Sequence, residues 1–104
     1  MNGTLPKAGR AYGKPDAVGQ AEEVYSAEFD SIFFRLDAKL RERIEAKIAE
    51  IGSRLESYPH HRLKGSSAFR VRVGDYRIVY RIDVQINAIV LITLGHRREV
   101  YRTL

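Results

Sequence analysis

Apolar positions along this chain follow a helical period in one half and a β-strand period in the other. Between residues 29 and 36, and again between 40 and 55, they recur at spacings of three and four, which places them on one face of a helix. Ser26 and Asp37 precede these segments and suit the N-cap position. Pro59 disfavours a helical conformation in the residue before it, so we expect the second helix to end there. The pattern predicts two amphipathic helices joined as an antiparallel hairpin.

A β-hairpin is predicted from Phe69 to Tyr80. Apolar and basic residues alternate before Gly74-Asp75 at a period of two, as in a half-buried strand. A two-residue loop with glycine first suits a type II′ turn. Such a loop fixes the register and predicts four cross-strand pairs: Val73 with Tyr76, Arg72 with Arg77, Val71 with Ile78, and Phe69 with Tyr80.

Three further segments complete the predicted sheet. Residues 88–94 are an almost continuous apolar run, typical of a strand buried on both faces at the sheet centre, and Gly95 is expected to end it. Residues 22–25 are predicted to form a short first strand, and residues 96–102 a charged last strand or tail. The elements together predict an α+β fold: a small, mostly antiparallel sheet with an N-terminal helical hairpin packed on one face.

Length and composition indicate a single domain at residues 22–104, preceded by a flexible leader at residues 1–21. The leader holds four of the eight glycines and two of the three prolines. The chain has no cysteine, which excludes disulfides and thiolate metal sites and is typical of a cytoplasmic protein. No apolar run approaches the roughly 18 residues of a membrane span, so we expect no membrane partner.

Positive charge is concentrated in the half that contains the predicted hairpin. The chain has a net charge of +5, and residues 60–104 hold nine Lys or Arg against three Asp or Glu. The predicted register places Arg70, Arg72 and Arg77 on the face opposite the apolar side chains, with Arg72 directly across from Arg77. Like charges across a strand pair are destabilising, so this arrangement favours an anion or phosphate site over a surface that is merely basic.

Metal binding is not indicated by the histidines. His60 and His61 are adjacent, but one further histidine and no cysteine remain to complete a site. We therefore expect both to be loop residues, and we expect no metal and no other cofactor.

Three motifs, in this order and spacing, carry a family resemblance: Arg-Leu-Lys-Gly at residues 62–65, the hairpin at 69–80, and Gly-His-Arg-Arg-Glu-Val-Tyr at 95–101. From about residue 24 to 101 the chain resembles the RelE/ParE superfamily of bacterial and archaeal toxins. It is most similar to the RelE branch, whose members cut messenger RNA on the ribosome. The resemblance implies an active surface on the sheet face that the helices leave uncovered.

The resemblance also implies a reaction and the residues that perform it. The reaction would be metal-independent, ribosome-dependent RNA cleavage, in which a ribose 2′-OH attacks the adjacent phosphate. The implied catalytic residues are Arg70, Arg72, Arg77, Arg97 and Tyr101. The implied RNA-binding residues are Lys64, His96 and Arg98. The implied partners are the ribosome, messenger RNA and a cognate RelB-like antitoxin that is acidic and partly disordered.

The sequence departs from the RelE pattern at one pair of positions. RelE has lysines where this chain has Arg70 and Arg72. Arginine stays protonated in proteins, so neither residue is suited to act as a base. Tyr101 is the first candidate for the general base, and His96 is the second because histidine titrates near neutrality.

Two other functions remain open at this point. A ParE-like inhibitor of DNA gyrase would share the fold but would not depend on Arg97 and Tyr101. A non-catalytic relic would bind an antitoxin or nucleic acid only. The absence of lysine at positions 70 and 72 leaves this alternative open.

Overall fold

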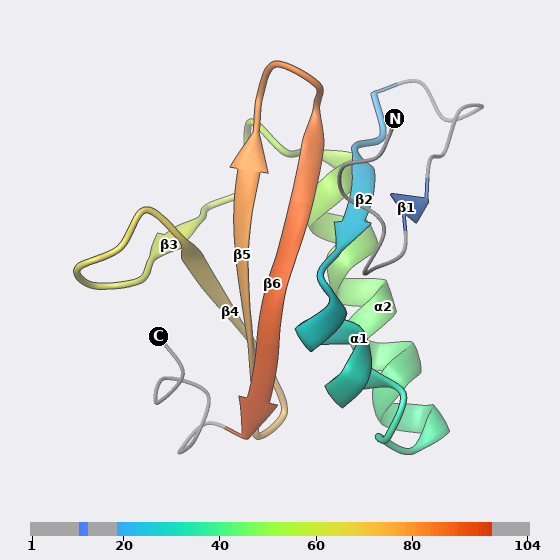
Figure 1. Ribbon diagram of the computed structural model, residues 1–104. Coiled ribbons are helices and arrows are strands. Elements are labelled where there is room, and N and C mark those ends of the chain that lie inside the picture. Colours follow the sequence, from blue (N-terminus) through green and yellow to red (C-terminus); the bar gives the residue numbers. More distant parts are fainter. Residues whose placement is uncertain (1–10, 13–18, 97–104) are drawn as a thin grey trace.

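The computed structural model of the protein describes residues 11–12 and 19–96. These residues form two helices and a six-stranded sheet in the order β1-β2-β6-β5-β4-β3 (Figure 1). The helices are α1, Ala27–Phe33, and α2, Ala38–Ser53. The strands are β1 Ala11–Tyr12, β2 Glu22–Tyr25, β3 His61–Arg62, β4 Phe69–Val73, β5 Tyr76–Asp83 and β6 Ala88–His96. The predicted α+β class is confirmed. Neither of these helices has the length and apolar character needed to cross a membrane.

The sheet is mixed but mostly antiparallel. β2 runs parallel to β6, and the other four strand pairs are antiparallel. β6 lies between β2 and β5, as predicted for an apolar strand at the sheet centre. Its pairing with β5 continues through Gly95 to His96, so the prediction that Gly95 ends this strand was wrong. The ladder continues because Gly95 still pairs with a residue of β5, Arg77.

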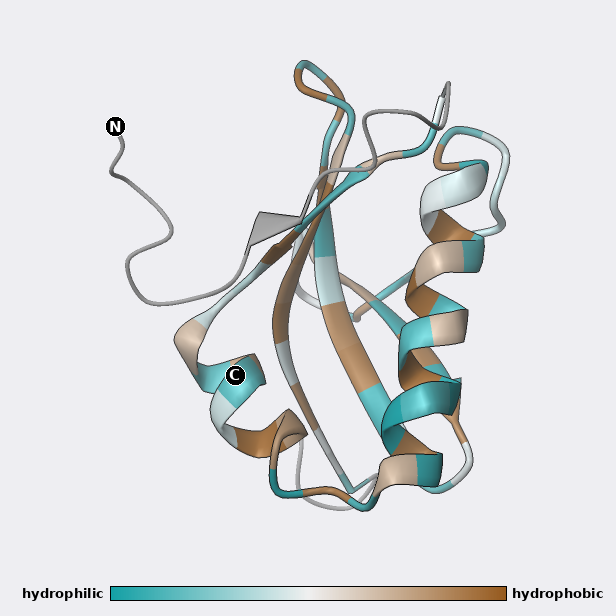
Figure 2. Ribbon diagram, turned by 90° about the vertical axis from the view of Figure 1, so that its right-hand side faces the viewer, coloured by the Kyte–Doolittle hydropathy of each residue, from teal (hydrophilic) through white to brown (hydrophobic). Residues whose placement is uncertain are grey.

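One hydrophobic core joins both helices to one face of the sheet. Hydrophobic residues recur along α2 beside the strands, as Figure 2 shows. The core residues fully or almost fully buried include Phe29 and Phe33 of α1, Ile44, Ile48 and Ile51 of α2, and Ile78, Tyr80, Ile89, Leu91 and Leu94 of the sheet. The helices therefore cover one face of the sheet and leave the opposite face open.

Both predicted N-caps are confirmed. The Ser26 hydroxyl accepts a hydrogen bond from the Phe29 N–H at 3.0 Å and donates one to the Ile92 carbonyl of β6 at 2.5 Å. The Asp37 carboxylate accepts from the Leu40 N–H at 2.8 Å. These caps satisfy amide groups that have no partner within the first helical turn.

The second helix ends at Ser53, six residues before the proline that we expected to end it. Arg54 leaves the helical conformation at φ −148° and ψ 56°. The Gly52 carbonyl instead accepts a hydrogen bond at 3.0 Å from the N–H of Ala21, a fully buried residue. A tertiary contact at the C-terminal turn, and not the proline, therefore accompanies the end of α2.

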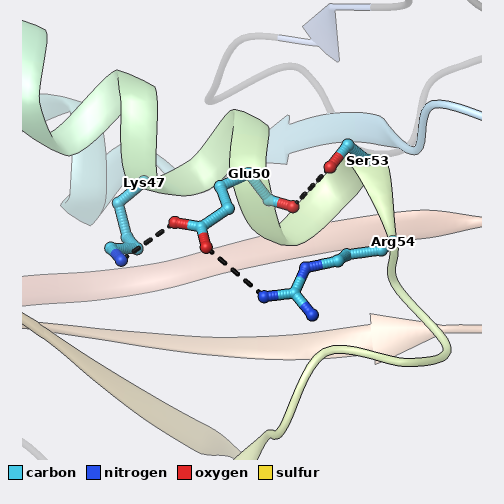
Figure 3. A network of polar contacts seen from close by, with 4 residues as sticks. All are labelled: Lys47, Glu50, Ser53 and Arg54. Carbon is cyan, nitrogen blue, oxygen red and sulfur yellow. Dashed lines mark hydrogen bonds and ion pairs between the residues drawn. The ribbon is translucent and has the colours of Figure 1, made fainter.

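A surface network joins the last turns of α2 (Figure 3). The Glu50 carboxylate accepts from Lys47 at 2.9 Å and from Arg54 at 3.5 Å, and the Ser53 hydroxyl donates to the Glu50 carbonyl at 2.7 Å. Exposed ion pairs of this kind contribute little to stability. Their consequence here is that Glu50 already has cationic partners in Lys47 of α2 and in Arg54, the residue that follows the helix.

The two adjacent histidines have different environments. His60 lies in the connection after α2, where its ring nitrogens contact the Tyr80 hydroxyl at 2.7 Å and the Leu55 carbonyl at 2.6 Å. His61 belongs to β3 and pairs with Arg70, so the prediction of a loop was wrong for this residue. His61 is a strand residue because its backbone pairs with the edge of β4.

Part of the expected leader at residues 1–21 is described by the structure. Ala11–Tyr12 pairs with β2, and Ala21 is fully buried against α2. Residues 1–10 and 13–18 lie outside the described residues. The predicted last strand or tail at residues 96–102 also lies outside the described residues, except for His96.

Candidate functional site

The predicted hairpin register is confirmed at every pair. Val73 pairs with Tyr76, Arg72 with Arg77, Val71 with Ile78, and Phe69 with Tyr80. Gly74 has φ +61° and Asp75 does not have a positive φ, in keeping with a type II′ turn. All the apolar members of these pairs pack in the main core, so the arginines that alternate with them belong to the opposite face.

The open sheet face has a small apolar cluster of its own. Val79 is fully buried there with Ala68, and the half-buried Leu63 and Ile92 pack against them. Leu63 and Ala68 come from the β3–β4 connection, which thus folds over part of β5. This cluster fixes the connection as a wall beside the arginines.

Local hydrogen bonds shape the β3–β4 connection. The Leu63 N–H donates to the Ala68 carbonyl at 2.8 Å, and the Ser66 N–H donates to the Leu63 carbonyl at 3.1 Å. The Ser66 hydroxyl in turn accepts from the Ala68 N–H at 3.0 Å. Gly65 takes φ +76°, a conformation that favours glycine. The tight turn holds Lys64 at the edge of the sheet face.

A concave pocket of about 810 Å³ lies between this turn and the arginines of the sheet. Its lining residues are Arg62, Leu63, Lys64, Gly65, Ser66, Arg70, Arg77 and Arg81. None of them is acidic. The Arg62 guanidinium lies over the Phe69 ring, 5.0 Å from its centroid. Five cations therefore line the pocket: Arg62, Lys64, Arg70, Arg77 and Arg81.

Arg77 has an unsatisfied hydrogen-bond donor. Its Nε is buried, and no partner for it occurs among the described residues. Leaving a buried donor unpaired costs about 1–3 kcal/mol, and more when the group is charged. A bound oxyanion would remove that penalty by accepting this hydrogen bond.

The side chain of Arg72 turns away from the pocket that Arg70 and Arg77 line. Its Nε donates to the Gly74 carbonyl at 2.8 Å, which turns the side chain toward the β4–β5 turn. There it lines a second concavity of about 470 Å³ together with Arg43, Lys47 and Glu50 of α2. The structure thus brings Arg70, Arg77 and Lys64 together but leaves Arg72 outside their pocket.

His96 also lies away from the pocket. It pairs with Tyr76 across β5 and β6, and the two rings are 6.0 Å apart between centroids. Because Tyr76 packs on the main core, His96 belongs to the helix-covered face. The predicted residues Arg97, Arg98 and Tyr101 lie outside the described residues.

Arg62 and Arg81 line the pocket although sequence reasoning gave neither a role. The period of two does place Arg81 on the same face as Arg77. Among the described residues, no group of three or more His, Asp or Glu is arranged to hold a metal ion.

A protein-family model described as "ParE toxin of type II toxin-antitoxin system, parDE" matches residues 20–101. The chain belongs to the RelE/ParE superfamily of type II toxin–antitoxin toxins. The match spans both helices, the hairpin and the C-terminal motif. No curated protein sequence matches the chain.

Solved structures of this superfamily share the fold. A doubly substituted Escherichia coli RelE toxin in the free state is 13% identical with a TM-score of 0.67, covering 81% of this chain and 90% of that one. The RelBE2 toxin–antitoxin complex of Mycobacterium tuberculosis has a sequence identity of 19% and a TM-score of 0.62, covering 79% of this chain and 95% of that one. The RelB–RelE complex of Methanococcus jannaschii has an identity of 23% and a TM-score of 0.60, covering 77% of this chain and 96% of that one. At these identities the likeness extends to the fold alone.

Proposed function

We propose that this RelE/ParE toxin is a ribosome-dependent endoribonuclease that cuts messenger RNA without a metal ion. The observation that carries the proposal is the pocket on the open sheet face. It gathers five cations without a carboxylate among its lining residues, and one of them, Arg77, has a buried donor without a described partner. A phosphate group supplies the charge and the acceptor atoms that such a site lacks.

The chemistry divides into holding the phosphate and moving protons. Attack of the 2′-OH on the adjacent phosphate forms a P–O bond and breaks the bond to the 5′-oxygen, leaving a cyclic phosphate and a 5′-hydroxyl. Arg70 and Arg77 would hold the phosphate oxygens and stabilise the charge that develops on them. Arg72 and Arg97 complete the set of cations that the resemblance implies.

Removal of the 2′-OH proton is assigned to Tyr101, and solvent water supplies the proton to the leaving 5′-oxygen. A base must take the proton of the 2′-OH and an acid must supply one to the leaving 5′-oxygen. Arginine cannot readily do the first. The location of His96 on the helix-covered face favours Tyr101 over His96 as the base.

The proposed partner is a cognate antitoxin with an acidic segment. The similar solved structures include complexes of RelE with RelB. Carboxylates of such a segment would complement the five pocket cations electrostatically and exclude RNA from them.

The test is to map messenger RNA 5′ ends in a bacterium after brief induction of the toxin. New ends inside codons of translated messages are expected with the unaltered chain, and they should be lost or much reduced with Tyr101→Phe. Tyr58→Phe is the matched control, since Tyr58 packs near His60 and lines no part of the pocket. Ends that persist in Tyr101→Phe would remove this residue from the mechanism.

A second candidate is inhibition of DNA gyrase. It is favoured by the family model that matches the chain, which describes a ParE toxin. Under this alternative, induction stops growth and provokes a DNA-damage response without new RNA ends. Absence of both growth arrest and new ends would leave the non-catalytic binding protein.

A further inference from the structure

The strand register defines a triangle of arginine positions on the open sheet face: Arg70, Arg77 and Arg81. Arg70 pairs directly with Val79. Arg77 and Arg81 lie two residues before and after Val79 on β5, so both are diagonal neighbours of Arg70 on the same face, at about 7–8 Å. All three line the one pocket, whereas Arg72 donates to the Gly74 carbonyl outside it. The cationic site is therefore centred farther from the β4–β5 turn than the Arg72–Arg77 pair.

The spacing within the triangle favours two phosphates over one. Arg77 and Arg81 are four residues apart on β5, which corresponds to about 13 Å between their backbone positions at about 3.3 Å per residue. One phosphate beside Arg70 can contact one of them, and a second anionic group lets the other bind without both side chains bending toward the same point. The half-buried Leu63 lies in the pocket wall and provides an apolar surface beside the cations. Anionic groups that alternate with flat apolar groups are the chemistry of a single-stranded polynucleotide.

We propose that Arg81 binds the phosphate next to the one held by Arg70 and Arg77, so that the pocket takes at least two consecutive phosphodiesters of a single RNA strand. This assignment rests on the proposed function for the identity of the ligand as RNA. Arg81 is a positioning residue: it contacts a phosphate that is not cut, and it sets how long a strand must be to bind fully. Lys64, across the pocket on the β3–β4 turn, adds charge without defining that length.

The test uses the purified full chain and strands in which 2′-O-methyl groups prevent cleavage. Binding of a dinucleotide with one phosphodiester and of a hexanucleotide is measured by fluorescence anisotropy at several salt concentrations. Arg81→Gln should weaken binding of the hexanucleotide about tenfold, as expected for the loss of a charge-assisted hydrogen bond. It should also reduce the magnitude of the negative slope of log association constant against log salt concentration by about 0.7, the value for one phosphate contact on a single strand. Binding of the dinucleotide should not change.

Two further variants separate a specific contact from general charge. Arg81→Lys keeps the positive charge and should restore the salt slope. Arg35→Gln removes one positive charge from an exposed site after α1, where Arg35 donates to the Ser31 carbonyl, and should bind both strands like the unaltered chain.

The outcomes distinguish this inference from the proposed function. An equal loss for the two strands with Arg81→Gln, or the same loss with Arg35→Gln, would overturn the role of Arg81 while leaving RNA cleavage intact. If the unaltered chain cuts messenger RNA but Arg81→Gln binds the hexanucleotide normally, the inference fails alone. If the unaltered chain binds neither strand but binds an acidic peptide, the identification of the ligand as RNA fails, and mapping of RNA ends tests that independently.

Discussion

At the scale of single residues, His60 links two elements that are far apart in the sequence. Its Nε2 contacts the Leu55 carbonyl, which can only accept, so this nitrogen carries the proton. Nδ1 then accepts from the Tyr80 hydroxyl. The imidazole thereby connects the turn after α2 to the central part of β5. Sequence reasoning assigned His60 to a connection but could not supply these partners, because they come from residues 5 and 20 positions away.

Tyr80→Phe should therefore lower the free energy of unfolding by about 1–3 kcal/mol, because His60 Nδ1 would be left without its donor. Burial raises the pKa of the Tyr80 hydroxyl. The unfolded chain therefore ionises at a lower pH than the folded chain. The free energy of unfolding falls as pH rises above about 10, the ordinary pKa of a phenol. Phenylalanine cannot ionise, so the stability advantage of the unaltered chain should shrink above that pH. Urea unfolding at pH 7 and pH 10.5 measures both effects.

Tyr58→Phe provides the comparison for this substitution. The Tyr58 ring lies 5.3 Å from the His60 ring between centroids, and no hydrogen bond of its hydroxyl occurs within the described part of the chain. It should cost much less than Tyr80→Phe at neutral pH. Equal costs for the two substitutions would show that the Tyr80–His60 hydrogen bond contributes nothing measurable.

At the scale of elements, the β4–β5 hairpin was predictable and its side chains were only partly so. A two-residue turn that begins with glycine permits one register, and the period of two then assigns each residue to a face. The orientation of Arg72 was not predictable, because it depends on the Gly74 carbonyl and on space beside α2. The end of α2 was missed for a similar reason, since the Ala21–Gly52 hydrogen bond crosses 31 positions.

Gly74→Ala should destabilise this hairpin by about as much as Gly65→Ala destabilises the β3–β4 turn. Both glycines have positive φ, so both substitutions carry a conformational cost of about 1 kcal/mol. A Cβ on Gly74 would lie 3.4 Å from the Arg43 guanidinium, an ordinary contact with the end of a flexible side chain, and a Cβ on Gly65 would meet nothing within 4 Å. Parallel urea unfolding of the two variants compares the two costs. A clearly larger cost for Gly74→Ala would mean that Arg43 cannot move aside.

At the scale of the whole molecule, the two faces of the sheet have different roles. The helix-covered face holds the main core, and the open face holds the cationic pocket. The sequence was sufficient for this division because a strand pattern separates apolar from basic residues residue by residue. It was insufficient for the site itself, since the wall supplied by the β3–β4 turn forms only when Leu63 and Ala68 pack on Val79.

Because neighbouring residues of a strand lie on opposite faces of the sheet, substitutions at adjacent positions should affect function and stability differently. Arg77→Ala should abolish growth arrest and leave the circular dichroism spectrum unchanged, because the side chain lies outside the main core and its buried Nε has no described partner to lose. Arg97→Ala should behave in the same way if the C-terminal motif contributes the charge that the resemblance implies.

Ile78→Ala is the matched control for Arg77→Ala, one residue along β5 on the opposite face. Ile78 is fully buried, so its truncation should cost about 2–5 kcal/mol and reduce growth arrest only through loss of folded protein. Its thermal unfolding midpoint should fall, while that of Arg77→Ala should stay the same or rise. A lowered midpoint for Arg77→Ala would mean that the open face contributes to stability as well as to function. Growth arrest that survives Arg77→Ala would place the toxic surface elsewhere on the molecule.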